Sequence, residues 1–173
     1  MPEKTIVMLG DSITEGGDWE NLLPNATILN HGNGGDTTAG VLRRLRSVVT
    51  ARPAAVMLLI GTNDIGIGVP EATIVANSIA IVQRLRTELP AAGIYVQSIM
   101  PREPRFGAEI VRVNAAVSAR STLLGAAGID LWPAFADGAG GLRDEFSLDG
   151  LHLSEAGYAA WAVELRRLVP LVR

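Results

Sequence analysis

The sequence contains no cysteine among its 173 residues. Disulfide bridges, thiol nucleophiles and zinc sites with cysteine ligands are therefore excluded. Aromatic residues make up 5% and charged residues 19% of the chain, whereas 48% is apolar and the mean hydropathy is +0.27. A disordered chain has too few apolar residues to offset the entropy lost on folding. The composition therefore predicts a compact globular protein, and the length predicts one domain over residues 1–173.

The sequence also lacks a long apolar run. The longest one, Ala54–Ile60, is far below the ~20 residues that a membrane-spanning helix needs. The start, Met1–Lys4, leads directly into the short apolar stretch Thr5–Leu9, without the apolar region and small-residue cleavage site of a signal peptide. We therefore expect no membrane span and a cytoplasmic protein.

The sequence also has no excess of basic residues, and its net charge is −3. A surface that binds nucleic acid usually has a basic excess or a clustered basic face. Three nearby arginines, Arg43, Arg44 and Arg46, are too few for such a face, and we interpret them as a solvated side of a helix. We expect no nucleic-acid partner.

Short apolar runs alternate with longer helical patterns along the chain. Continuous apolar runs are typical of parallel strands buried on both faces, and apolar residues three and four apart predict helices. The predicted strands are Thr5–Leu9, Ala26–Asn30, Ala55–Ile60, Ile94–Ile99 and Ile129–Leu131. The predicted helices are Thr37–Val49, Glu71–Leu89, Ala108–Ala127 ending near Gly128, and a last helix from the N-cap Ser154 to Leu168. This order predicts an α/β protein, a three-layer α/β/α sandwich around a five-stranded parallel sheet.

Ligands of such folds bind outside the carboxyl ends of the strands. Ser12 follows the first predicted strand in Gly10-Asp11-Ser12, where Gly10 permits a tight turn. A serine at this point is well placed as a nucleophile, although it stays weak until a base takes its proton. Taken alone, this loop fits an ordinary turn or N-cap serine better than a catalytic one.

The chain has only two histidines, so few residues qualify as the base. His152 lies three residues after Asp149, and in a turn these two side chains face each other. The carboxylate then fixes the histidine tautomer and leaves the second ring nitrogen free to face a serine. An ordinary turn explains the pair equally well. We interpret the other histidine, His31, as structural or as part of a pocket wall.

Two further loops carry donors that suit a developing oxyanion. Gly35 lies in a glycine-rich loop that enters a helix, where backbone amides point outward. Asn63 directly follows the third predicted strand and offers a neutral side-chain donor. Each loop alone fits a turn. Because each of these groups follows a different strand, the fold brings them to one edge and completes an acyl-transfer site.

Four blocks of the sequence resemble the SGNH hydrolases, also called GDSL-type esterases, including their platelet-activating-factor-acetylhydrolase-like members. The blocks stand in the family's order: Gly10-Asp11-Ser12-Ile13, Gly35-Asp36-Thr37-Thr38, Gly61-Thr62-Asn63-Asp64 and Asp149-Gly150-Leu151-His152. The resemblance implies a flavodoxin-like fold, a triad of Ser12, His152 and Asp149, and no metal or organic cofactor. It also implies an oxyanion hole built from the amides of Ser12 and Gly35 and the side chain of Asn63. Ile13 stands where the family name has leucine, and Gly32-Asn33-Gly34 makes the second block unusually rich in glycine.

For the substrate we expect a small ester with a short acyl group, acetyl first, because no loop resembles a lid or a long acyl tunnel. A lysophospholipase or thioesterase is the alternative within this chemistry. The candidate pocket residues are Asp11, Trp19, Ile65, Ile67 and Phe106. The sequence does not decide whether the protein forms a homodimer. If it does, the candidates for the dimer surface are the aromatic residues Phe106, Trp132, Phe135 and Trp161.

Three other classes of function would need other features of the sequence. Neither G-x-G-x-x-G after the first strand nor a P-loop occurs, which disfavours nucleotide binding. A metal-dependent phosphohydrolase would use the carboxylates of Asp11, Asp36, Asp64 and Asp149. A non-catalytic binding module on the same fold is the third alternative, since a fold does not determine a function.

Overall fold

The computed structural model describes residues 5–173, so Met1–Lys4, on which part of the signal-peptide argument rests, lies outside the described residues. Five parallel strands form one sheet in the order β2-β1-β3-β4-β5. The strands are β1 Thr5–Gly10, β2 Thr27–Gly32, β3 Ala55–Leu59, β4 Gly93–Gln97 and β5 Ala127–Ile129. This order is the flavodoxin-like one, and it confirms the predicted α/β fold class.

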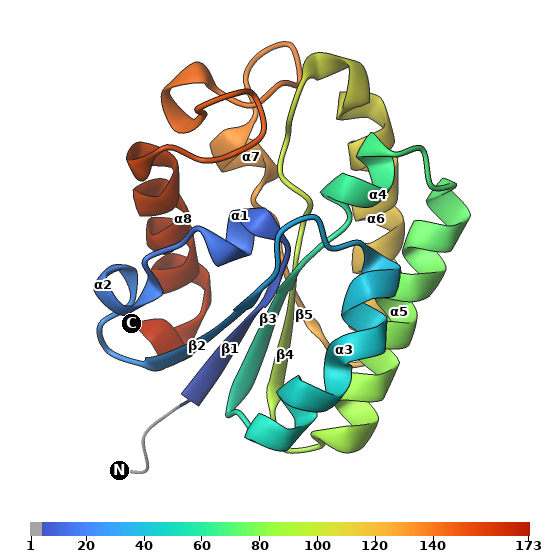
Figure 1. The fold of residues 1–173 in the computed structure, drawn as a ribbon, viewed down its shortest axis with the longest axis vertical. Helices are drawn as coiled ribbons and strands as arrows, with labels where there is room; N and C mark the ends of the chain where they lie inside the picture. Colours follow the sequence, from blue (N-terminus) through green and yellow to red (C-terminus); the bar gives the residue numbers. More distant parts are fainter. Residues whose placement is uncertain (1–4) are drawn as a thin grey trace.

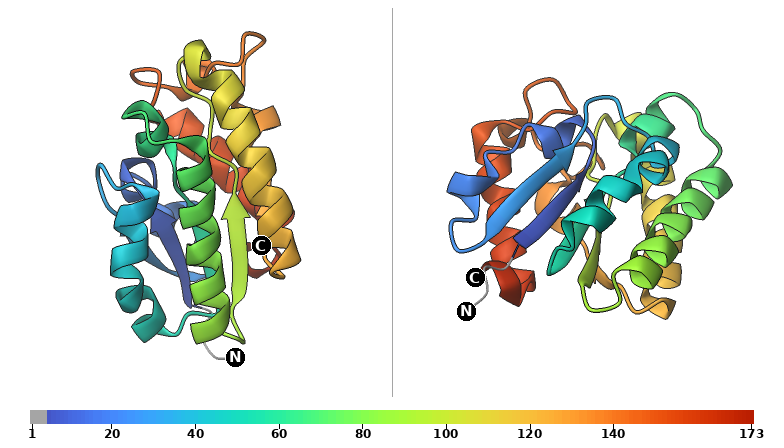
Figure 2. Two further views of the ribbon diagram at one scale, coloured as in Figure 1. Left: turned by 90° about the vertical axis from the view of Figure 1, so that its right-hand side faces the viewer. Right: turned by 60° about the horizontal axis from the view of Figure 1, so that its bottom comes forward.

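Helices cover both faces of the sheet, as Figures 1 and 2 show. One layer consists of α3 Thr38–Ala51, α4 Thr62–Gly66, α5 Glu71–Glu88 and α6 Gly107–Leu123. The other layer consists of α1 Ser12–Glu15, α2 Trp19–Leu22, α7 Trp132–Phe135 and α8 Glu155–Leu168. Three short 3-10 helices complete the described chain: η1 Pro104–Phe106, η2 Asp144–Phe146 and η3 Pro170–Val172.

The strands separate two hydrophobic cores. In β1, Val7 and Leu9 point into the core under α3, α5 and α6, whereas Ile6 and Met8 point into the core under α8. All four side chains are 0% exposed. Each fully buried aliphatic side chain contributes roughly 1.5–3 kcal/mol relative to an exposed one. Burial on both faces explains why the central strands read as continuous apolar runs rather than as alternating ones.

The predicted boundaries around β5 are wrong. Helix α6 ends at Leu123 instead of Ala127, because Gly125 adopts a φ of +76° that a helix does not allow. Gly128 therefore lies inside β5, beside Val96 of β4, rather than at a helix end. Leu131 is not part of the strand, since its N–H donates to the Ser98 hydroxyl at 2.8 Å.

Strand β4 ends two residues earlier than predicted, at Gln97. The side chain of Asn114 binds the backbone of Ile99 on both sides, accepting from its N–H at 2.8 Å and donating to its carbonyl oxygen at 2.9 Å. The short helices α1, α2, α4 and α7 occupy segments in which the sequence predicts neither a helix nor a strand. Four or five residues are too few to show a helical pattern in a sequence.

Two of the four aromatic residues considered for a dimer surface are fully buried. Phe135 and Trp161 are 0% exposed and belong to the core under α8. Neither side chain is available to a partner. Within residues 5–173, no helix has both the length and the apolar character needed to cross a bilayer.

Candidate active site

Ser12 opens helix α1 directly after β1. The preceding residue, Asp11, is the N-cap, and its Oδ1 accepts the N–H of Ile13 at 3.0 Å. A side chain on Gly10 would have no room, because its Cβ would lie 2.4 Å from the carbonyl oxygen of Leu59. The chain therefore turns tightly between strand and helix, and this turn holds Ser12 at the carboxyl edge of the sheet.

The structure brings His152 and Asp149 to this serine from the far end of the chain. Ser12 Oγ lies 3.1 Å from His152 Nε2, and His152 Nδ1 lies 2.8 Å from Asp149 Oδ2. The other carboxylate oxygen, Oδ1, accepts the backbone N–H of Leu151 at 3.0 Å and of His152 at 2.7 Å. This turn makes the two side chains face each other, as their spacing of three predicts. A serine, a histidine and a carboxylate in such a chain have the geometry used for nucleophilic catalysis.

Hydrogen bonds keep the carboxyl group of Asp149 ionised. The bond with the His152 side chain, followed by the backbone donor of His152, lowers the pKa of Asp149 to about 2. An ionised carboxylate accepts the Nδ1–H of the imidazole, which leaves Nε2 as the acceptor that faces Ser12. Gly150, between them, has a φ of +83°, a left-handed conformation that glycine adopts without strain.

The glycine-rich loop and helix α4 lie next to each other at the same edge. Asn63 Nδ2 donates to the backbone carbonyl oxygen of Asp36 at 2.8 Å, which joins the two segments. A side-chain amide carries two N–H groups, so one stays available to a ligand. Gly35 has a φ of +75°, and nothing lies within 4 Å of the place where its Cβ would be. Its backbone conformation, rather than crowding, therefore favours glycine there.

A buried network holds these loops in place. Asp64 is 1% exposed, and its carboxylate accepts the N–H of Thr38 at 2.8 Å and the Thr38 hydroxyl at 2.6 Å. Asp36 accepts from Arg44 Nε at 2.5 Å. Both carboxylates thus bind donors of the protein. The described part of the chain contains no group of three or more histidine and acidic side chains with metal-site geometry.

Arg44 has a different role from the one we predicted. Besides its bond to Asp36, its Nη2 donates to the carbonyl oxygens of Gly10 and His31, each at 2.9 Å. The guanidinium group therefore joins the ends of β1 and β2 to the glycine-rich loop, and its interpretation as part of a solvated helix face is wrong.

Three of the predicted pocket residues do not reach the surface. Asp11, Trp19 and Ile65 are 0%, 3% and 2% exposed. Trp19 packs edge-on against Trp161 with ring centroids 4.8 Å apart, and its Nε1 donates to the Thr14 carbonyl oxygen at 2.9 Å. Direct contact of these side chains with a substrate is therefore not supported.

The other two predicted pocket residues are accessible. Phe106 is half-buried, with the guanidinium carbons of Arg102 and Arg105 at 4.4 and 4.6 Å from its ring centroid. Ile67, which follows α4, is 72% exposed. Sequence reasoning missed Leu148, which is 74% exposed and directly precedes Asp149. The sequence contains a signal for Leu148, because it is an apolar residue directly beside the candidate catalytic residue Asp149.

His31 takes no part in the contacts of the triad. It is half-buried, and burial, together with the positive charge of Arg44, lowers the pKa of its imidazole. His31 also lines a small pocket with Trp19 and Asn30, so its placement fits both roles expected for it, structural or part of a pocket wall. Of the two histidines, only His152 contacts Ser12.

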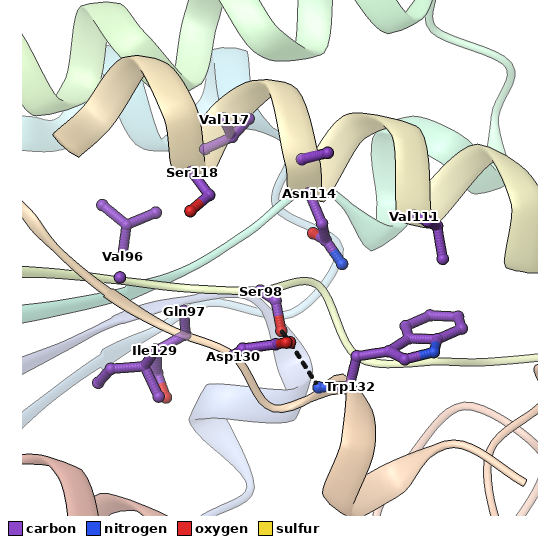
Figure 3. A pocket seen from close by; sticks show the side chains of 12 residues that line it. Val96, Gln97, Ser98, Val111, Asn114, Val117, Ser118, Ile129, Asp130 and Trp132 are labelled. Atoms are coloured by element: carbon purple, nitrogen blue, oxygen red, sulfur yellow. Dashed lines mark hydrogen bonds between the residues drawn. The ribbon is translucent and has the colours of Figure 1, made fainter. Parts of the chain in front are cut away.

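A cavity of about 390 Å³ lies elsewhere, between α6 and the ends of β4 and β5 (Figure 3). Its walls include Val111, Asn114, Asp130 and Trp132. None of the residues of the Ser12 site lines it. The candidate ester site is therefore the open edge around Ser12 rather than this cavity.

Residues 8–160 match the GDSL-like Lipase/Acylhydrolase family. The chain belongs to this family. The family comprises hydrolases of ester bonds, and the match spans Ser12, Gly35, Asn63, Asp149 and His152.

Several relatives of this GDSL-like hydrolase are platelet-activating factor acetylhydrolase subunits. It is 32% identical to the IB subunit alpha1 of Pongo abelii over 169 residues, covering 91% of this chain and 71% of the relative. It is 31% identical to the IB subunit alpha2 of Rattus norvegicus over 183 residues, covering 96% of this chain and 76% of the relative.

Solved structures share the fold. A Streptococcus pneumonia protein named after platelet activating factor superposes with a TM-score of 0.86 at 31% identity, covering 95% of this chain and 83% of the other. A GDSL-like lipase from Bacteroides thetaiotaomicron gives a TM-score of 0.82 at 22% identity, over 95% of this chain and 86% of the other. The second likeness supports the fold alone.

Proposed function

We propose that this protein is a serine esterase that hydrolyses short-chain acyl esters, with acetyl as the preferred group. Ser12 is the nucleophile, His152 the general base and Asp149 the residue that orients the base. The backbone amides of Ser12 and Gly35 and the side chain of Asn63 form the oxyanion hole. The observation that carries the proposal is the unbroken chain of contacts from Ser12 Oγ to His152 Nε2 at 3.1 Å and from His152 Nδ1 to Asp149 at 2.8 Å.

The proposed reaction has two steps. Ser12 Oγ attacks the acyl carbon while its proton moves to His152 Nε2, and the carbonyl electrons move to the oxygen. The tetrahedral intermediate collapses, the C–O bond to the alcohol breaks, and the alcohol leaves with the proton from Nε2. Water then attacks the acyl-serine in the same way, gives its proton to His152, and releases the acid as Ser12 regains its hydrogen.

Hydrogen-bond donors that bind the oxyanion of the tetrahedral intermediate lower the energy barrier of both steps. Removal of one such donor costs roughly 3 kcal/mol in other hydrolases. Asn63 is suited to this work because its amide is already held by the Asp36 carbonyl oxygen, so little ordering is needed when the negative charge forms.

One observation supports a short acyl group. The expected absence of long loops at the site does not, because the connection 136–154 between α7 and α8, which carries Asp149 and His152, is long and contains only η2. Relatives at 31–32% identity are named acetylhydrolases. The exposed apolar side chains of Ile67 and Leu148, 72% and 74% exposed, offer a contact surface for a longer chain. They favour a lysophospholipase or thioesterase as the second candidate.

The test is hydrolysis of p-nitrophenyl acetate, butyrate and octanoate by the wild-type chain and by Ser12→Ala. We expect the highest kcat/KM on acetate and a loss of at least a thousandfold in the variant. Ser47→Ala, at an exposed serine of α3, is the matched control and should keep full activity. Equal activity of Ser12→Ala and wild type would overturn the proposal, and a preference for octanoate would favour the second candidate.

A further inference from the structure

The cavity between α6 and the ends of β4 and β5 takes no part in the mechanism proposed above. Its volume of about 390 Å³ lies within the range of roughly 300–1,000 Å³ that is typical of sites for small ligands. Ligands of parallel α/β sheets bind beyond the carboxyl ends of the strands. Ser98 follows the end of β4 and Asp130 follows the end of β5, and both line this cavity. The cavity therefore has the size and the place of a second ligand site.

Two facing walls enclose the cavity, as Figure 3 shows. Helix α6 contributes Val111, Asn114 and Ser118 to one wall, and the segment after β5 contributes Asp130 and Trp132 to the other. Val111 is 48% exposed and Trp132 is half-buried, and both lie at the same end of the cavity. An apolar body that fills this end shields both side chains from water, which is favourable in proportion to the apolar area buried.

Two polar side chains of the walls are held by the protein itself. The amide of Asn114 binds the backbone of Ile99, at 2.8 and 2.9 Å. The Ser98 hydroxyl accepts the N–H of Leu131 at 2.8 Å and donates to Asp130 Oδ1 at 3.3 Å. These contacts fix both walls without the help of a ligand, so the cavity is formed before a ligand enters.

Asp130 gives the cavity a negative charge. Its Oδ1 accepts the Ser98 hydroxyl and, at 3.1 Å, the backbone N–H of Trp132. A carboxylate offers about four acceptor positions on its two oxygens, so capacity for further donors remains. None of the ion pairs within residues 5–173 involves Asp130. A carboxylate without a counterion favours a positively charged ligand and repels an anion.

We propose that this cavity binds a small organic cation with a flat apolar body, of the class of the aromatic amines. The apolar ring packs at the end formed by Trp132 and Val111, and the ammonium group donates to the carboxylate of Asp130. Charge complementarity selects this class over alcohols and fatty acids of similar size. The bond to the Trp132 N–H does not by itself require an aspartate, because an asparagine offers the same acceptor without the charge.

The test uses three probes that share a phenyl ring and differ in their polar end. At pH 7, 2-phenylethylamine is a cation, 2-phenylethanol is neutral and phenylacetate is an anion. For so small a ligand we expect the amine to bind with a Kd of roughly one millimolar. The alcohol should bind roughly three- to tenfold more weakly, and phenylacetate more weakly still, because only the charge of the polar end changes its interaction with Asp130. Equal binding of all three probes overturns the proposal.

An NMR titration of the tryptophan indole N–H signals locates the bound amine. Of the three tryptophans, Trp132 lines this cavity. Trp19 and Trp161 are 3% and 0% exposed, and their indole N–H groups donate to the Thr14 carbonyl oxygen and to Gln97 Oε1. The Trp132 signal, assigned with Trp132→Phe, should shift to saturation while the Trp19 signal stays in place. An equal shift of both signals, or no shift at about 20 mM amine, overturns the proposal.

A charge-removing variant tests the role of Asp130. Asp130→Asn keeps an acceptor for the Trp132 N–H, so the preference for the amine over the alcohol should vanish while the Kd of the alcohol stays the same. Asp137→Asn is the matched control, because Asp137 is exposed, accepts the N–H of Ala139 at 2.8 Å and does not line the cavity. This control should keep the wild-type preference. An unchanged preference in Asp130→Asn contradicts recognition of the charge.

A filling variant tests the location, without use of the esterase assay. Ala115 lines the cavity from α6, so Ala115→Phe should abolish binding of all three probes. Ala119→Phe, at an exposed position of the same helix outside the cavity, should bind as the wild type does. Ser12→Ala should also keep the wild-type Kd for the amine, even if the chain hydrolyses no ester. Retained binding in Ala115→Phe, or lost binding in Ser12→Ala, overturns the assignment of the amine to this cavity.

Discussion

The side-chain amide of Asn63 donates to the backbone carbonyl oxygen of Asp36 at 2.8 Å, although the two residues are 27 positions apart. This single contact joins helix α4 to the glycine-rich loop that contains Gly35. The two proposed oxyanion donors outside α1 are therefore not independent, because the position of one fixes the position of the other. The same contact also orients the remaining N–H of the Asn63 amide.

Replacement of Asn63 by alanine tests this donor. The variant should lose roughly a hundredfold in kcat on p-nitrophenyl acetate with little change in KM, because an oxyanion donor acts mainly in the transition state. Steady-state kinetics separate the two constants. Asn21→Ala, at an exposed asparagine of α2, is the control and should behave like the wild type. A change confined to KM would mean that Asn63 binds substrate instead.

Replacement of Asp149 by asparagine tests the orientation of the base. Asparagine presents an amide to His152 Nδ1 and no longer favours the tautomer in which Nε2 accepts the proton of Ser12. We expect a loss of roughly a hundred- to ten-thousandfold in kcat with an unchanged melting temperature, since the Asp149 side chain is 54% exposed. Asp144→Asn, in the neighbouring η2, is the matched control. Full activity of Asp149→Asn would assign the residue to the turn alone.

The stability of the protein should depend on pH through Asp11. Its pKa rises from the ordinary value of 3.8 to about 6 in the folded chain, so the folded state favours the neutral carboxyl group. The stability that this group contributes is therefore complete below pH 3.8 and is lost as the pH rises through about 6. The difference between the two pKa values corresponds to about 3 kcal/mol.

Asp11→Asn removes this pH dependence. The free energy of unfolding of the variant, relative to the wild type, should rise by about 3 kcal/mol between pH 4 and pH 8. Urea unfolding at each pH measures it, and Asp18→Asn provides the comparison with an exposed carboxylate. A difference that is constant over this range would show that Asp11 is ionised equally easily in both states. The outcome is independent of the esterase assay.

Asp64 should contribute to the stability of the protein. It is 1% exposed, and its carboxylate binds the N–H and the hydroxyl of Thr38 at the start of α3. Asp64→Ala leaves both donors unpaired in the interior, so we expect a loss of about 2–4 kcal/mol in the free energy of unfolding. Chemical denaturation measures this loss. The conservative variant Asp64→Asn, which keeps one acceptor oxygen, should recover part of it.

Much of the fold is predictable from local patterns. Thr5–Leu9 and Ala55–Ile60 read as buried strands because both faces of the sheet are covered, and the observed strands start at the same residues. The boundary between α6 and β5 was not predictable in this way. A three-residue edge strand is too short to show a pattern, and its position depends on pairing with Tyr95–Gln97 of β4.

By itself, the sequence determined the alternation of strands and helices, the family motifs and the candidates for the residues that carry chemistry. These follow from local periodicity and from short motifs, which need no knowledge of distant contacts. Only the tertiary structure decided which side chains meet. Ser12 and His152 are 140 positions apart, the Asp11 carboxyl group is buried with one unpartnered oxygen, and Arg44 binds the carbonyl oxygens at the ends of β1 and β2. These long-range contacts and the burial of a polar side chain arise from the packing of the whole chain, and no local pattern encodes them.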